Sequence, residues 1–210
     1  MREQMKEIFY DECTVWKKTG FCVGRKLWVS EREIAVDYKG EAIKQPKYKY
    51  EEIVCFKNAC NYNEKKAICI GYNPALAIKE IDATNKRLIT KLEKEGYSGY
   101  VLYNLYPEVT ATKDVVDMED AENKNSHIFL RKKIFESNIN DIILFFGRTA
   151  QITKEIVKLL REMIGKKNVM LTCFNSEFIH PGAVGTFELQ DFKEEYIRNR
   201  QIQPIRIQEV

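Results

Sequence analysis

Three polar side chains stand directly after apolar runs in this sequence, where a ligand could reach them. In "AICIGYNPALA" (67–77) the apolar run stops at Gly71, and the next turn presents the Asn73 amide on a backbone restricted by Pro74. Asn104 ends the apolar run in "VLYNLYP" (101–107), where a buried amide can contact a nucleobase edge at two points. His180 in "FIHPGAVG" (178–185) can donate a hydrogen bond to a developing oxyanion without being charged. These groups suit a base or an amide-like heterocycle.

Each of these side chains also has a structural explanation when it is considered alone. An asparagine in a turn commonly bonds to its own backbone, and a histidine can be a satisfied core residue. The functional interpretation of Asn73, Asn104 and His180 therefore depends on whether the fold brings them together.

Strand-like and helix-like segments alternate from residue 66 onward and must position these side chains. Strands are predicted at 66–72, 99–107, 141–147 and 168–174, and helices at 82–96, 120–138, 149–165 and 186–200. This alternation predicts an α/β fold, a three-layer α/β/α arrangement with a central, mainly parallel four-stranded sheet. Right-handed crossovers place every strand-to-helix turn at one edge, and open sheets of this kind bind ligands at that carboxyl edge.

The first 66 residues show a different pattern. "FCVGRKLWVS", "EIAVDYKG" and "KYEEIVCFKN" read as strands or hairpin pieces, with Gly24 and Gly40 at turns. We predict an N-terminal antiparallel β extension (1–66) packed on an α/β domain (67–210). Lysines and tyrosines alternate between Lys39 and Lys66, which is typical of a solvated surface or, as the alternative, of a nucleic-acid footprint.

Composition narrows the class of protein. The chain has 210 residues, 44% hydrophobic and 31% charged, and a net charge of +3, which is weak evidence about partners. Its apolar runs are too short for a membrane span, and its charged N-terminus lacks the apolar core of a secretory signal. Six cysteines without a Cys-x-x-Cys pair indicate a reducing compartment rather than a zinc site. We therefore expect a cytoplasmic monomer with no metal and no cofactor.

The motifs resemble two known families. "GYNPALA", "VLYNLYP", "DIILFFGRTA" and "FIHPGAVG" are similar, in order and spacing, to motifs of the uracil-DNA glycosylase superfamily, especially its mismatch-specific uracil/thymine glycosylases. "GYNPALA", "DATNKRL", "GYSGYVLYNLYPEVTATKD" and "HPG" also resemble an uncharacterised bacterial domain family of similar architecture. The second resemblance covers more of the motifs.

The glycosylase resemblance implies a role for each matching residue. Asn73 would position the water that attacks the sugar carbon, His180 would stabilise negative charge on the departing base, and Asn104 would recognise the flipped base. Val184 matches the residue that wedges into the base stack. By the same resemblance the substrate-binding residues are Gly71, Tyr72, Pro74, Ala75, Asn104 and Arg87, and the DNA-binding residues are Pro181, Gly182, Val184 and Arg148.

The sequence also departs from the glycosylase pattern. Efficient uracil-specific enzymes have aspartate at the position of Asn73, so an amide implies slower chemistry. They have tyrosine at the position of Ala75, and the smaller alanine implies room for a 5-substituent on a pyrimidine. The stacking aromatic is not identified, with Tyr72, Tyr103 and Tyr106 as candidates.

Some polar residues near these turns keep two explanations. Asp82 and Thr84 form either a helix cap or a polar wall of the pocket, and Arg87 is either a surface residue or a contact for a phosphate or sugar. Arg148 offers the same alternatives. The resulting hypotheses are a DNA glycosylase acting on a flipped uracil, thymine or 5-modified pyrimidine and, as the alternative, a non-catalytic nucleotide- or nucleic-acid-binding protein. The partner is then single- or double-stranded DNA, or a nucleotide.

Overall fold

The computed structural model describes the chain in ten stretches, which together contain every predicted strand of the central sheet. These stretches are residues 6–11, 23–30, 32–36, 42–56, 65–74, 82–110, 116–147, 152–174, 177–183 and 186–192.

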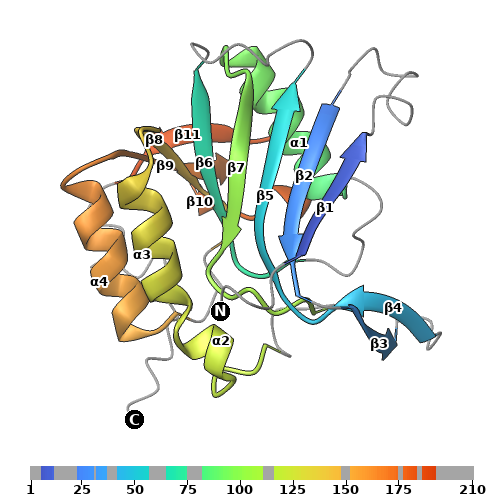
Figure 1. Ribbon diagram of the computed structural model, residues 1–210. Coiled ribbons are helices and arrows are strands. Elements are labelled where there is room, and N and C mark those ends of the chain that lie inside the picture. The colour runs from blue at the N-terminus through green and yellow to red at the C-terminus, as the bar shows by residue number, and fades with distance from the viewer. Residues whose placement is uncertain are drawn as a thin grey trace.

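One nine-stranded mixed sheet forms the centre of the described structure (Figure 1). Its order is β1-β2-β5-β7-β6-β8-β9-β10, and β11 also pairs with β9, on the side away from β10, because Cys173 of β9 lies opposite both Phe178 and Glu188. The strands are β1 (Lys6–Asp11), β2 (Val23–Val29), β5 (Lys49–Phe56), β6 (Lys66–Gly71), β7 (Gly99–Asn104), β8 (Asp141–Leu144), β9 (Asn168–Phe174), β10 (Glu177–Phe178) and β11 (Glu188–Asp191). A separate antiparallel pair is formed by β3 (Arg32–Val36) and β4 (Ala42–Pro46).

The α/β class is confirmed, whereas the prediction of a mainly parallel four-stranded sheet is wrong. The four predicted strands are the parallel centre, β7-β6-β8-β9. Antiparallel strands extend it on both sides, because β5 hydrogen-bonds to β7 and both β10 and β11 hydrogen-bond to β9. The sequence pattern of one strand does not contain the identity of its neighbour, so the width of the sheet was not predictable from it.

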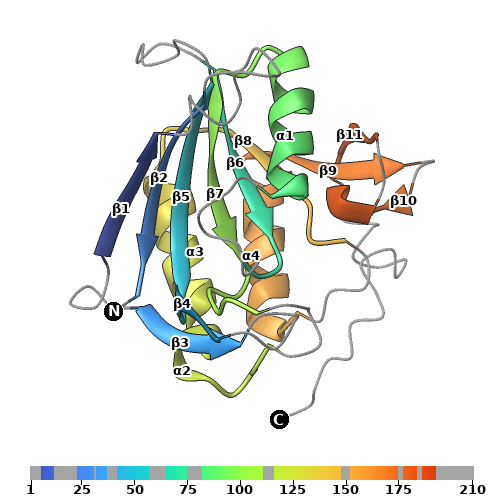
Figure 2. The same ribbon diagram turned by 90° about the vertical axis from the view of Figure 1, so that its right-hand side faces the viewer.

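Helices cover both faces of this sheet. Figure 2 shows α1 (Ala83–Lys94) on one face and α3 (Ser126–Glu136) with α4 (Lys154–Ile164) on the other. The short α2 (Ala121–Lys124) precedes α3, so the single helix predicted over 120–138 is two helices. Each face has its own apolar cluster: α1 contributes Leu88, Ile89 and Leu92 to one, and α3 and α4 contribute Leu130, Ile134, Ile156, Leu159, Leu160 and Met163 to the other.

Local sequence signals explain where these helices begin and end. Asp82 caps α1 by accepting a hydrogen bond from the backbone N–H of Asn85 at 2.8 Å, and Gly96 follows the helix with a positive φ of 79°. Thr153 caps α4 in the same way by accepting from the N–H of Ile156. These are the cap and stop residue types from which the helices were predicted.

The region 186–200 is not a helix where it is described. Glu188–Asp191 form β11 and pair antiparallel with Met170–Cys173 of β9. The helix prediction is wrong there because the backbone N–H and C=O groups bond to β9, and this tertiary pairing overrides the local helical pattern.

The N-terminal strands join the same sheet as the predicted α/β domain. The proposed boundary between residues 66 and 67 falls at the start of β6, while β5 already lies beside β7 in register, with Glu52 opposite Leu102. The division into 1–66 and 67–210 stays a prediction. Within the described residues, no helix combines the length and apolar composition that crossing a membrane requires.

Candidate functional site

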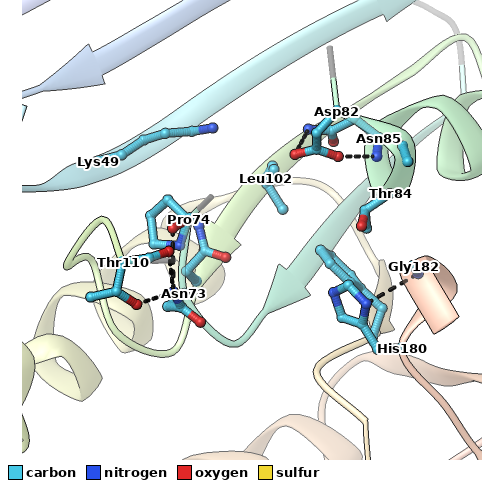
Figure 3. A pocket seen from close by; sticks show the side chains of 13 residues that line it. Lys49, Asn73, Pro74, Asp82, Thr84, Asn85, Leu102, Thr110, His180 and Gly182 are labelled. Atoms are coloured by element: carbon cyan, nitrogen blue, oxygen red, sulfur yellow. Dashed lines mark hydrogen bonds between the residues drawn. The ribbon is translucent and has the colours of Figure 1, made fainter. Parts of the chain in front are cut away.

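A cavity of about 390 Å³ opens at the carboxyl ends of the parallel strands, on the face covered by α1. Strand order places it where ligands of open α/β sheets bind, because the chain runs from β6 to β7 on one side and from β8 to β9 on the other, which makes the β6/β8 boundary a switch point. Figure 3 shows side chains converging on it from segments far apart in the sequence. The lining residues are Lys49, Asn73, Pro74, Asp82, Ala83, Thr84, Asn85, Leu102, Asn104, Thr110, Phe145, His180 and Gly182.

The structure brings Asn73, Asn104 and His180 together in this one cavity. They come from the turn after β6, the end of β7 and the segment after β10. The convergence expected from parallel topology therefore holds in space, and the roles of the three residues remain to be tested.

The Asn73 amide is held in one orientation by its own neighbourhood. Its Nδ2 donates to the Thr110 hydroxyl at 2.7 Å and to the backbone carbonyls of Pro74 at 3.3 Å and Thr110 at 3.4 Å (Figure 3). Because carbonyl oxygens only accept, the amide nitrogen must face them and the Oδ1 must point the other way. Asn73 can therefore offer an acceptor to a water or to an N–H group.

Asn104 is nearly buried, with 8% of its surface exposed, and it lines the cavity floor. Its side-chain amide makes no hydrogen bond with the part of the chain that the structure describes, so the amide is open to a partner in the cavity. Gly71 makes room for it: a Cβ there would come within 2.6 Å of Asn104 Oδ1 and 2.8 Å of Phe145 Cζ. Only glycine at position 71 leaves room for the Asn104 and Phe145 side chains where they stand.

His180 has a defined tautomer. Its Nδ1 accepts the backbone N–H of Gly182 at 3.1 Å, so the neutral ring carries its proton on Nε2. A Cβ on Gly182 would meet Nδ1 at 2.8 Å and Thr84 Oγ1 at 3.0 Å, so this loop fits closely against both side chains. His180 can donate a hydrogen bond without being charged.

The start of α1 supplies the polar wall opposite Asn73. Asp82 and Thr84 both line the cavity, and Asp82 also caps the helix. Asn85 completes this wall, with its Oδ1 accepting from the Tyr100 hydroxyl at 2.7 Å. The cap and the polar wall, which were alternatives for Asp82, are both present in the structure.

Arg87 does not line the cavity. Its guanidinium donates to the backbone carbonyl of Pro181 at 2.5 Å and so ties α1 to the loop that carries His180. Pro181 is itself buried and begins a 3-10 turn (Pro181–Ala183). In this structure Arg87 and Pro181 bond to each other and hold the loop, and the substrate and DNA contacts expected for them stay predictions.

The aromatic wall of the cavity is Phe145, which the sequence analysis missed. Its ring centroid lies 5.8 Å from that of His180 at an interplanar angle of 48°. Tyr72, by contrast, packs edge-on against Tyr106 in the core cluster of the opposite face, and Tyr103 belongs to that cluster too. The sequence did contain a signal for Phe145. Side chains alternate between the two faces along 142–146, and Phe145 shares the face of Ile143.

Lys49 is a second lining residue that was missed. Its Nζ lies 2.6 Å from Glu52 Oε2, and the two side chains are only 5% and 0% exposed. The sequence placed Lys49 in a lysine-rich segment expected on the surface, and for Lys49 this expectation is wrong. Lys47 and Lys65 of that segment are exposed, and Lys47 pairs with Asp120 at 3.1 Å.

Two of the described cysteines, Cys69 and Cys173, are buried and unreactive. Burial raises the pKa of the Cys69 thiol, which lies two residues before Gly71 on the cavity side of β6. Burial and the nearby Glu188 charge raise the pKa of Cys173 to about 11. Both thiols are protonated small core residues, as the sequence indicated. Among the described residues, no group of three or more His, Cys, Asp or Glu could hold a metal ion.

Three predicted site residues lie outside the described residues. These are Ala75, which was expected to leave room in the pocket, Val184, which was expected to wedge into DNA, and Arg148. Their predicted roles stay predictions.

The fold and cavity together define an open α/β protein with one polar, mostly uncharged site at the switch point of its sheet. Residues 55–181 match the family described as "Protein of unknown function (DUF1643)", and the chain belongs to this family. The matched region runs from β5 to Pro181 and contains Asn73, Asn104 and His180. No curated protein and no solved structure matches the chain.

Proposed function

We propose that the cavity binds a nucleobase and that the protein is a DNA glycosylase acting on a flipped uracil, thymine or 5-modified pyrimidine. The observation that carries the proposal is the meeting of Asn73, Asn104 and His180 in one cavity, with the Asn104 amide buried and free to bond a ligand there. The resemblance of their motifs to the uracil-DNA glycosylase superfamily supports the same roles.

Each polar atom then has a task in hydrolysis of the glycosidic bond. Asn104 bonds the edge of the base, and Phe145 offers an aromatic surface beside it. Asn73 Oδ1 accepts from a water whose oxygen attacks C1′ of the sugar. As the C1′–N bond breaks, its electron pair leaves with the base, and His180 Nε2–H donates to the oxygen that gains negative charge. The proton lost by the water completes the released base.

Binding without hydrolysis is a second candidate function, because the Asn73 side chain is an amide. An amide cannot take a proton from water, and this amide is tied to Thr110 and Pro74 through its nitrogen. The protein would then bind a nucleotide or nucleic acid without hydrolysing it.

Base release from oligonucleotides tests the proposal directly. Purified protein is mixed with single- and double-stranded oligonucleotides that contain uracil, thymine opposite guanine, or 5-substituted cytosine. Abasic sites are then detected by alkaline cleavage. We expect slow release from at least one substrate, and a decrease of about 10²-fold or more in Asn73→Ala and in His180→Ala, from the loss of transition-state contacts.

Asn168→Ala is the matched control. Asn168 is an exposed asparagine that bonds to Asp141 at the opposite, amino edge of the sheet. It should release base at the wild-type rate. Absence of cleavage on every substrate would reject the glycosylase, and nucleotide binding without turnover would then favour the second function.

A further inference from the structure

Lys49 brings a buried positive charge into the cavity from a strand outside the glycosylase resemblance. Its backbone N–H donates to the Pro107 carbonyl at 2.8 Å, which fixes the start of β5 beside the end of β7. From there the side chain extends over Leu102 toward the α1 side of the cavity (Figure 3).

The Lys49 ammonium has hydrogen-bonding capacity left for a ligand. Within the described part of the chain its one partner is Glu52, at 2.6 Å. An ammonium group has three N–H donors, and a buried charge with unused donors is costly unless an acceptor meets them. Since the side chain is only 5% exposed and lines the cavity, a ligand bound there can supply that acceptor.

The charges around Lys49 limit which acceptor fits. Glu52 already neutralises Lys49, and Asp82 adds a carboxylate on the α1 side of the cavity, toward which the Lys49 side chain extends (Figure 3). A phosphate would meet two carboxylates and one ammonium, which opposes its binding. An uncharged ring with a carbonyl oxygen toward Lys49 and an N–H toward Asp82 satisfies both groups.

We propose that Lys49 is a specificity-determining residue that donates to a carbonyl oxygen of the bound base. The site therefore selects bases with an oxo group next to a ring N–H over bases with an amino group there. The proposal rests on the proposed function for the identity of the ligand as a base. It does not depend on hydrolysis.

The test compares uridine with cytidine, which differ in this oxo or amino group, by NMR titration of the full chain. Lys49→Met is combined with Glu52→Leu, because Lys49→Met alone would strand the Glu52 charge in the core. We expect wild type to prefer uridine and the double variant to lose about 10- to 100-fold in uridine affinity, since a hydrogen bond to a charged group is lost. Cytidine affinity should stay unchanged.

Lys133→Met is the matched control. Lys133 forms an ion pair at 2.9 Å with Glu51, the residue before Glu52. Glu51 also accepts a hydrogen bond from Tyr103, which belongs to the apolar cluster on the face opposite the cavity. This variant should bind uridine as wild type does. Thermal unfolding of all variants verifies that each is folded.

Several results with the two nucleosides would overturn the assignment. These are unchanged uridine affinity in the folded double variant, an equal loss for cytidine, and no binding of either nucleoside to wild type. A loss confined to uridine 5′-monophosphate would also overturn it, because Lys49 would then bind a phosphate. Base release from oligonucleotides would still sustain the proposed function in each of these cases, whereas uridine selectivity without release would reject hydrolysis and leave Lys49 as assigned.

Discussion

Individual atoms in the cavity have their hydrogen-bonding direction set by their neighbours. The Gly182 N–H makes His180 Nδ1 an acceptor, and two backbone carbonyls make Asn73 Nδ2 a donor. His180 therefore carries a donor on Nε2, and Asn73 carries an acceptor on Oδ1. At the scale of residues, backbone N–H and carbonyl groups therefore decide which side-chain atoms donate and which accept, and a sequence motif does not show these groups.

Gly182→Ala tests this control of His180. The added Cβ would come within 2.8 Å of Nδ1 and 2.9 Å of Cε1, so the ring must move and lose its bond to the residue 182 N–H. We expect wild-type His180 to show the Nε2–H tautomer in ¹⁵N NMR and the variant to show a changed tautomer ratio. Base release, where present, should fall about tenfold or more.

The other histidine provides the control for this measurement. The sequence has two histidines, and His127 lies on the exposed start of α3, so His127→Gln assigns the signals. An unchanged His180 spectrum in Gly182→Ala would contradict the close fit of this loop.

At the scale of elements, α1 and its flanking loops act as one unit. Asp82 caps the helix at the cavity, and Arg87 one turn later holds the Pro181 carbonyl. On the opposite face, α3 and α4 are joined by a bidentate pair in which Arg131 Nε and Nη2 each lie 2.9 Å from Glu162. The same carboxylate accepts from Lys166 at 2.8 Å. Helix-to-helix bonds of this kind stabilise the layers without entering the site.

Glu162→Gln should make stability less dependent on acid pH. Hydrogen bonds from Arg131 and then Lys166 lower the pKa of Glu162 from 4.5 to about 2. A carboxyl whose pKa is lower in the folded state stabilises the fold above pH 4.5 and loses that contribution as the pH falls through about 2. We therefore expect the variant to have a lower thermal midpoint than wild type at neutral pH, by a few degrees at most because the pair is exposed.

The difference between the two proteins should shrink below pH 4.5 and disappear near pH 2. Thermal unfolding followed by circular dichroism across this range measures it. A difference that persists unchanged at pH 2 would contradict the role of the Glu162 charge.

For the whole molecule, the decisive feature is that the N-terminal strands complete the sheet. β5 covers the outer edge of β7 and places Val54 and Phe56 in the α1-side core. The same strand carries Lys49 into the cavity. The site is therefore shared between the two regions that the sequence separated.

Removal of residues 1–64 should prevent cooperative folding of the remainder. The fragment would expose the edge of β7 and lose Val54 and Phe56 from the core, about 1.5–3 kcal/mol for each side chain. That loss is large against a typical stability of about 5–15 kcal/mol. We expect aggregation or a non-cooperative urea transition by circular dichroism. A cooperative transition in the fragment 65–210 would instead support the predicted domain boundary.

The sequence by itself determined the local features of this protein. Apolar run lengths located β6, β7, β8 and β9, and the cap and stop residues Asp82 and Gly96 located α1. Parallel topology then brought Asn73 and Asn104 to one edge, and His180 reaches the same cavity after the antiparallel β10. These features are predictable because periodicity, caps and crossover handedness act over a few residues or follow general rules of chain geometry.

Only the tertiary structure decided which strands are neighbours and which side chains face the cavity. The pairing of β5 with β7 turned Lys49 from an expected surface residue into a buried lining residue, and the pairing of β11 with β9 replaced an expected helix. Phe145 is the aromatic wall in place of Tyr72, because Tyr72 continues the face of Ile68 and Ile70 into the opposite apolar cluster, whereas Phe145 continues the face of Ile143. Strand pairing is set by packing between distant segments, and the sequence of one segment does not contain the surface that it will meet.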